Sequence, residues 1–216
     1  IIHDVAPGAE LAFRTGFISA GDFADGIIEL QQAGCNVIVD DVTYITEPYF
    51  KKGLISEAVD SVASLGVSYF TAAGNFGTKS YEAIYSATAA PSGYTGTAHN
   101  YDGAGDITQG INLTAGDYTI VLQWEDSIYS LGQLPGALND LDIYLINDAG
   151  VKLFGYNRNN KWGDPVEVLP FSVSSAVHAN LMVVRASGTD NVRFKYIIFR
   201  GEGTFDEYLT GTSTLV

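Results

Sequence analysis

The sequence contains a single cysteine, Cys35, among its 216 residues. A disulfide needs two cysteines, so no bridge can form within the chain. Cys35 lies in the segment AGCNVIV, next to a run of apolar residues. We interpret it as a small hydrophobic residue of a folded core rather than as a nucleophile, because free cysteines are among the most buried residue types.

Basic residues are also scarce. The chain has 11 Lys and Arg against 25 Asp and Glu, which gives a formal net charge of -14. Such a surface repels phosphate backbones and anionic lipids, so we expect no nucleic-acid partner and no membrane partner. The chain also lacks the run of about 18 to 20 apolar residues that a membrane helix needs. It shows no signal peptide and begins with Ile1 inside an apolar pattern, from which we expect a piece of a longer protein.

The first ninety residues alternate short apolar runs with helical patterns. Helices are predicted where apolar residues recur at helical spacing and a glycine follows, at residues 22–34 and 55–66. Strands are predicted where short apolar runs stand between them, at residues 9–13, 35–42 and 67–73. The order strand, helix, strand, helix, strand is typical of a parallel sheet covered by helices.

The pattern changes near residue 91, after which helical spacing disappears. Seven alternating runs separated by Gly, Asn and Asp turns predict strands at residues 107–113, 117–124, 141–148, 151–157, 166–173, 179–187 and 192–200. Such a series indicates an antiparallel β-sandwich of jelly-roll kind. The predicted fold class is therefore α/β plus all-β. The α/β domain would span residues 1–91 and resume at about 204–216, with an inserted sandwich at 92–203.

Asn75 lies between two glycines directly after the predicted strand 67–73. In a parallel α/β sheet, ligands bind outside the carboxyl ends of the strands. The NH2 group of an asparagine placed there can donate to an oxyanion that develops during acyl transfer. The same residues also fit a simple turn after a strand, and by themselves they leave both interpretations open.

Two stretches resemble the subtilisin-like serine peptidases, or subtilases. Residues 5–9 (VAPGA) are similar to the stretch that follows the catalytic histidine helix of that family, and residues 72–77 (AAGNFG) are similar to its oxyanion turn. The resemblance covers residues 1 to about 86 in consistent order. It implies a three-layer parallel α/β sheet, a role for Asn75 as the oxyanion residue, and a secreted or cell-surface bacterial endopeptidase that cleaves polypeptide substrates through an acyl-enzyme.

The resemblance also implies that the catalytic Asp, His and Ser lie outside this sequence, so we expect the segment itself to be inactive. His3 comes too late to match the histidine of the family, and His99 and His178 are expected at the surface. Residues 211–213 (GTS) match three letters of the serine motif, but Ser213 is followed by a strand-like pattern. The alternative is an inactive subtilase-like scaffold whose sandwich binds protein, glycan or calcium.

Residues 41–43 stand where subtilases pair their backbone with the substrate. The resemblance therefore implies that Asp41, Val42, Thr43 and Gly74 bind substrate. The chain departs from the family pattern here: Asp41 and Glu47 would favour basic substrate residues, chelate a cation or remain solvated loop acids. These alternatives stay open.

Residues 140–150 (DLDIYLINDAG) resemble a stretch of the prepeptidase C-terminal β-sandwich modules that accompany secreted bacterial peptidases. Strand alternation places Asp140 and Asp142 on one face, where they could collect Ca2+ together with Asn139 and Asp164, or simply form a polar exterior. Calcium is the one cofactor that the sequence suggests. We also expect the inserted sandwich to gate or extend the substrate cleft, and the incomplete sheet of the segment to self-associate.

Overall fold

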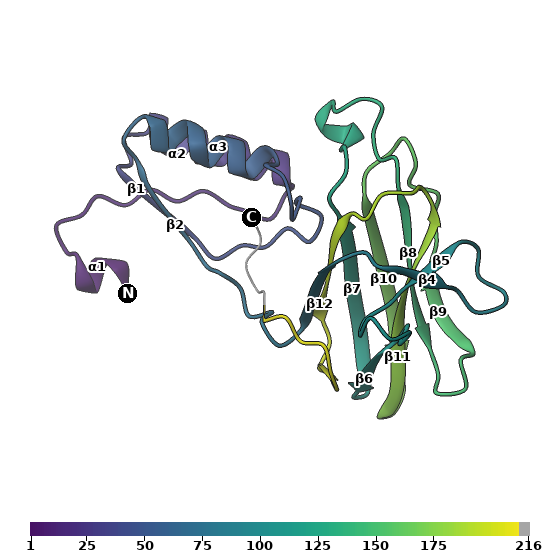
Figure 1. Ribbon diagram of the computed structural model, residues 1–216. Helices are drawn as coiled ribbons and strands as arrows, with labels where there is room; N and C mark the ends of the chain where they lie inside the picture. Colours follow the sequence, from purple (N-terminus) through teal and green to yellow (C-terminus); the bar gives the residue numbers. More distant parts are fainter. Residues whose placement is uncertain (212–216) are drawn as a thin grey trace. The chain divides into compact units, whose positions relative to one another are not determined.

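The structure is a computed structural model that describes residues 1–211 of the chain. The chain forms two compact units (Figure 1). The N-terminal unit comprises residues 1–47 and 52–72, and the sandwich unit comprises residues 48–51 and the chain from Ala73 onward. Strands outnumber helices, and most of the sheets are antiparallel. None of the helices in the described part of the chain is long and apolar enough to span a membrane.

The N-terminal unit is a parallel strand pair with two helices. Its elements in chain order are α1 (Ile2–Val5), α2 (Ala20–Gln32), β1 (Val37–Asp40), α3 (Leu54–Ser64) and β2 (Ser68–Thr71). Strands β1 and β2 pair in parallel, with Val37 opposite Ser68. Helix α2 begins because Ser19 caps it: the Ser19 hydroxyl accepts the Asp22 N–H at 3.1 Å. Both expected long helices are present.

The core of this unit lies on one face of the strand pair. Ile38 is buried with Ile27 of α2 and Val62 of α3, while Val37 and Val39, its neighbours along β1, are exposed. This alternation follows from the period of a strand, since successive side chains point to opposite faces. The helices therefore cover one face of the pair only.

The strand expected at residues 9–13 does not form. This segment is in neither of the two strands that pair in the N-terminal unit, and Phe13 is 91% exposed. A strand exists only through hydrogen bonds to a neighbour, and within the described residues β1 and β2 pair with each other. The predicted three-stranded parallel sheet is thus corrected to a two-stranded one.

The sandwich unit contains two antiparallel sheets. One has the order β10-β7-β12-β3, and the other has the order β13-β6-β11-β5-β4, with β8 also paired to β11 and β9 paired to β8. All seven strands predicted for this part are present, as β6 (Gln109–Leu113), β7 (Gly116–Trp124), β8 (Asp140–Ile146), β9 (Lys152–Tyr156), β10 (Val166–Val173), β11 (Val177–Ser187) and β12 (Arg193–Arg200). A short 3-10 helix, Tyr129–Leu131, lies between β7 and β8.

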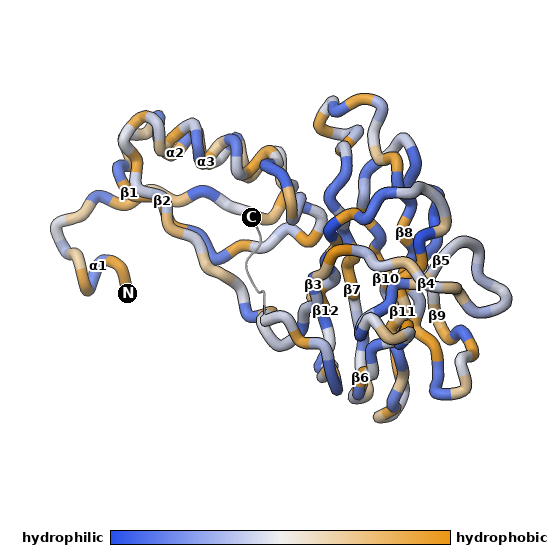
Figure 2. The backbone as a smooth tube through the Cα atoms, in the orientation of Figure 1, coloured by the Kyte–Doolittle hydropathy of each residue, from blue (hydrophilic) through white to orange (hydrophobic). Residues whose placement is uncertain are grey.

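One large core fills the space between these sheets. Trp124 of β7, Phe194 and Tyr196 of β12 and Leu181 of β11 are almost completely buried in it. Apolar residues recur along these strands, as Figure 2 shows by hydropathy. A second, smaller cluster on the far side of β8 and β11 includes Met182.

The sandwich unit is larger than the sequence predicts. It starts at Ala73 instead of residue 92 and includes the short strands β3 (Ser80–Ile84), β4 (Ala87–Ala89) and β5 (Thr97–His99). Strand β13 (Gly203–Phe205) pairs with β6, so residues 203–205 stay with the sandwich, where a return to the parallel sheet was expected. Strands of three residues, such as β4, β5 and β13, are too short for alternation to reveal them.

The loop between β1 and α3 also contributes to the sandwich unit, through residues 48–51. Tyr49 is only 3% exposed, and its backbone N–H donates to Gln123 Oε1 at 3.1 Å. Its ring contacts the ring of Phe199, with centroids 6.4 Å apart. A segment distant in sequence is thereby packed into the sandwich.

Candidate functional site

The carboxyl ends of β1 and β2 meet at one edge of the parallel pair. Asp40 and Thr71, the last residues of the two strands, lie opposite each other. The Asp40 carboxylate accepts hydrogen bonds from the Tyr69 hydroxyl at 2.6 Å, from the Thr71 hydroxyl at 2.9 Å and from the Val42 N–H at 3.1 Å. Burial and the Asp40 charge raise the pKa of Tyr69, so the phenol keeps the proton that it donates. Asp40 therefore ties both strand ends together.

A cavity of about 270 Å³ opens at this edge. Asp41 and Val42, two of the expected substrate-binding residues, line it together with residues 12–17 and apolar side chains of α2. Arg14 also lines it, but its guanidinium is held by Asp22 at 2.8 Å and by Glu29 at 2.7 Å. The charge of Arg14 is therefore neutralised by the two carboxylates. Because most of the remaining wall is aromatic or aliphatic, the cavity suits an apolar group.

Gly74 and Asn75 lie three and four residues after the end of β2, and the backbone bends at Asn75. Gly74 has a φ of 76°, a left-handed conformation that glycine adopts without steric cost. Asn75 is exposed, and its side chain makes no hydrogen bond within residues 1–211. Both residues belong to the sandwich unit, whereas residues 41–43 belong to the N-terminal unit. A joint site of these residues therefore remains a prediction.

Two of the three histidines, His99 and His178, have clear structural roles, whereas His3 is exposed in α1. His99 is 2% exposed, which corrects the expectation that it lies at the surface. The Nε2 atom of His99 lies 2.9 Å from the Tyr81 hydroxyl, and its Nδ1 atom accepts the Ser86 N–H at 3.2 Å. Burial lowers the pKa of His99 to about 4, so it is a neutral core residue.

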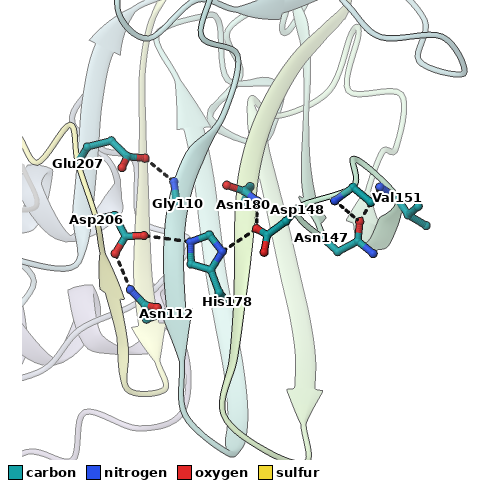
Figure 3. A network of polar contacts seen from close by, with 10 residues as sticks. Gly110, Asn112, Asn147, Asp148, Val151, His178, Asn180, Asp206 and Glu207 are labelled. Atoms are coloured by element: carbon teal, nitrogen blue, oxygen red, sulfur yellow. Dashed lines mark hydrogen bonds and ion pairs between the residues drawn. The ribbon is translucent and has the colours of Figure 1, made fainter.

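His178 lies between two carboxylates, as Figure 3 shows. Its Nδ1 atom is 2.6 Å from Asp148 Oδ1 and its Nε2 atom is 3.0 Å from Asp206 Oδ2. The two acids raise the pKa of His178, since they favour its charged form. Asn180 also donates to Asp148, at 3.0 Å. The network joins the β8–β9 turn and the segment after β13 to β11, which is a structural role.

Asp140 and Asp142, the expected calcium ligands, are buried on β8 instead of forming a polar exterior. They are 6% and 5% exposed and line a cavity of about 340 Å³. Asp140 Oδ1 accepts the Asn160 N–H at 3.0 Å, and Asp142 Oδ2 accepts the Tyr144 hydroxyl at 2.8 Å. Burial first, and then the charge of Asp140, raise the pKa of Asp142 to about 7.

The other two expected calcium ligands are engaged elsewhere. The Asn139 amide donates to Asp126 at 3.0 Å, and Asp164 accepts the Ser130 N–H at 2.8 Å. In residues 1–211 no group of three or more His, Cys, Asp or Glu side chains is arranged to hold a metal ion. Ser213, the serine of the GTS stretch, lies outside the described residues.

Sequence reasoning missed Asp40, Glu167 and Asn160. A signal for Asp40 was present in the sequence, because it is an acidic residue near the carboxyl end of a predicted parallel strand, where ligands bind. Glu167 carried no such signal, because a single glutamate in an alternating strand reads as solvent-facing. In the structure Glu167 is fully buried on β10, on the same strand face as Leu169 and Phe171.

No protein-family model matches the chain, and no curated protein matches it either. A solved structure similar to this chain is that of the Clostridium perfringens CspB protease, with a TM-score of 0.47 and 10% sequence identity. The match covers 90% of this chain and 44% of the protease. The chain thus spans less than half the length of this structural neighbour.

Proposed function

We propose that the chain is part of a secreted or cell-surface bacterial serine endopeptidase of the subtilisin-like kind. In this proposal Asn75 donates to the oxyanion of the tetrahedral intermediate, and residues 41–43 with Gly74 bind the substrate polypeptide. The catalytic Asp, His and Ser would be supplied by other parts of the longer protein. The Asn75 amide would act by stabilising charge that develops only in the transition state.

The shared carboxyl edge of β1 and β2 is the observation that carries the proposal. Because Asp40 and Thr71 lie opposite each other, the chain leaves the two strands at adjacent points. Residues 41–43 follow the end of β1, and Asn75 lies four residues after Thr71, the end of β2. The Asp40 carboxylate bonds residues at both strand ends. Substrate and oxyanion donors are needed at this kind of edge in parallel α/β enzymes.

The cavity at the same edge supports a substrate role for residues 41–43. Phe13, Phe17 and Phe23 contribute to its walls beside Asp41 and Val42. A substrate side chain that enters it would lose contact with water against aromatic rings, which favours apolar residues. We propose that the substrate preference is set by this apolar cavity, with Asp41 as the remaining negative charge.

A fluorophosphonate probe on the full-length protein tests the proposal. The probe labels a serine that is activated for acyl transfer, and its phosphoryl oxygen needs the same donors as an oxyanion. We expect Asn75→Ala to lower the rate constant of labelling about 100- to 1000-fold. Asn191→Ala, at an exposed asparagine of the sandwich unit, is the matched control and should leave the rate unchanged.

Two outcomes would contradict the proposal that the chain is part of a serine endopeptidase. The full-length protein could remain unlabelled although it is folded, or Asn75→Ala could label as fast as the control. Either outcome would favour the alternative, an inactive scaffold whose sandwich binds protein, glycan or calcium.

A further inference from the structure

We propose that the sandwich unit binds one Ca2+ ion in the cavity that Asp140 and Asp142 line, beside residues 157–160. This site is independent of the proposed peptidase activity. Its walls also include Tyr94, Tyr144 and Lys152. The proposal rests on the oxygen atoms that converge there and on their lack of partners.

Two residues of the cavity wall carry an unpartnered oxygen. Among the buried side-chain oxygens and nitrogens without a hydrogen bond in residues 1–211, the Tyr94 hydroxyl and Asp142 Oδ1 belong to residues that line the cavity. A buried oxygen without a partner costs free energy, so such an oxygen at a cavity wall calls for a ligand. Asp142 is 95% buried and lines the cavity, with Oδ2 bonded to Tyr144 and Oδ1 unpartnered.

Asn160, which is bonded to Asp140 but is not part of the cavity wall, has a further unpartnered oxygen. Its Nδ2 atom donates to the carbonyl oxygens of Asp164 and Val166, each at 2.8 Å, which fixes the orientation of the amide. The Oδ1 atom is then left without a partner. The Asn160 N–H donates to Asp140, so this residue is anchored next to the acidic pair.

The cavity wall carries more negative than positive side chains. Two buried carboxylates, Asp140 and Asp142, line it together with one lysine, Lys152. The Lys152 Nζ atom lies over the rings of Tyr144 and Tyr94, at 5.2 and 5.8 Å from their centroids. One lysine therefore stands against two carboxylates at the cavity wall. A bound cation would offset the remaining negative charge.

The donor types select calcium among the metal ions. Ca2+ takes six to eight oxygens and accepts neutral amide and backbone oxygens beside carboxylates. Here two carboxylates are joined by the side chains of Asn157 and Asn159 at the cavity wall. The described residues around the cavity offer no His or Cys, which Zn2+ prefers. Glu167 does not line the cavity and is therefore not among the proposed ligands.

Thermal unfolding with and without Ca2+ tests the site. Both tryptophans, Trp124 and Trp162, belong to the sandwich unit, so intrinsic fluorescence reports on its unfolding. After treatment with EDTA, we expect Ca2+ at tenfold excess over its Kd to raise the Tm by about 3 to 6 °C. The expected Kd is roughly 0.1 to 1 mM, the range of weak calcium sites in proteins. Mg2+ should have a much smaller effect, since it demands a tighter octahedral site.

Terbium provides a readout that does not depend on stability. Tyr94 and Tyr144 line the cavity, so Tb3+ bound there should luminesce when tyrosine is excited, and Ca2+ should displace it. Asp142→Asn should abolish both the Tb3+ signal and the Ca2+-dependent rise in Tm. Because this substitution keeps the shape and removes a buried charge, the metal-free variant should stay folded. Asp164→Asn, at an acid bonded to Ser130, is the matched control and should keep both effects.

Three results would overturn the proposal. The Tm of the EDTA-treated protein could be insensitive to 10 mM Ca2+, Tb3+ luminescence could persist in Asp142→Asn, or Mg2+ could match Ca2+. None of these results depends on labelling by the fluorophosphonate.

Discussion

The two units of this chain bury apolar surface in different ways. In the sandwich unit two sheets enclose a core of 21 buried residues between them. In the N-terminal unit six buried residues lie between two helices and one face of a strand pair. Its opposite strand face exposes Val37, Val39 and Phe70, and Phe13 and Phe17 are exposed as well.

The two units differ in whether they cover their own apolar surface. A sandwich closes its own core, because each sheet covers the apolar face of the other. A strand pair with helices on one face leaves the other face apolar and uncovered. Self-association of this chain through that face stays a prediction, consistent with the general behaviour of exposed apolar patches.

The largest expected effect is in the sandwich core. Phe194 is fully buried and contacts Tyr81 and Tyr85 through its ring. We expect Phe194→Ala to lower the free energy of unfolding of the sandwich unit by about 3 to 5 kcal/mol. Urea titration followed by tryptophan fluorescence measures it. Phe13→Ala removes an equal side chain that is 91% exposed and should change stability by less than about 0.5 kcal/mol. Equal losses in the two variants would contradict the comparison.

A smaller loss is expected in the N-terminal unit. Ile27 of α2 is buried in the core of this unit, which has only six buried residues. Ile27→Ala should cost about 2 kcal/mol, at the low end for such substitutions, because a small core can relax around the gap. Circular dichroism at 222 nm measures it, since both long helices lie in this unit. Val39→Thr on the exposed face serves as the control. If the tryptophan signal lost as much stability as the helical signal in Ile27→Ala, the division into two units would be wrong.

The smallest effect concerns His178 and pH. Its pKa is raised by Asp148 and Asp206, so its contribution to stability is fully present below its unfolded pKa of about 6.5 and is lost as pH rises through the raised value. The pair is partly exposed, so we expect less than about 1 kcal/mol. The urea midpoint of the native protein should therefore fall more steeply between pH 6 and 9 than that of His178→Asn.

The difference between the two pH profiles gives the contribution of His178 to the pH dependence of stability. The buried acids Asp142 and Glu167 also have raised pKa values and destabilise the sandwich in the same direction as pH rises, but they are present in both proteins. His3→Asn in the exposed α1 is the control substitution. Identical profiles for the native protein and His178→Asn would show that the network contributes nothing to folding.

Much of the secondary structure could be predicted because long elements carry their period in the sequence. Helices α2 and α3 and the seven strands from β6 to β12 span enough residues for apolar spacing to be read. Strands β3, β4, β5 and β13 were not predicted: β4, β5 and β13 have only three residues each, and β3 lies in the segment that was expected to connect the two domains. The predicted site residues stay a prediction: Asp41 and Val42 line a cavity, and their binding of substrate is untested. Asp40, which also lines the cavity, was not singled out from the sequence.

The sequence by itself determined the two long helices and the seven strands from β6 to β12, the excess of negative charge and the absence of a disulfide within the chain. These properties depend on residue type and on neighbours within a few positions. Tertiary structure alone decided that residues 9–13 form no strand, that Tyr49 enters the sandwich unit, and that Asp140, Asp142 and Glu167 are buried together. Pairing and burial are set by partners far away in the chain, and no local pattern specifies which partner a segment will meet.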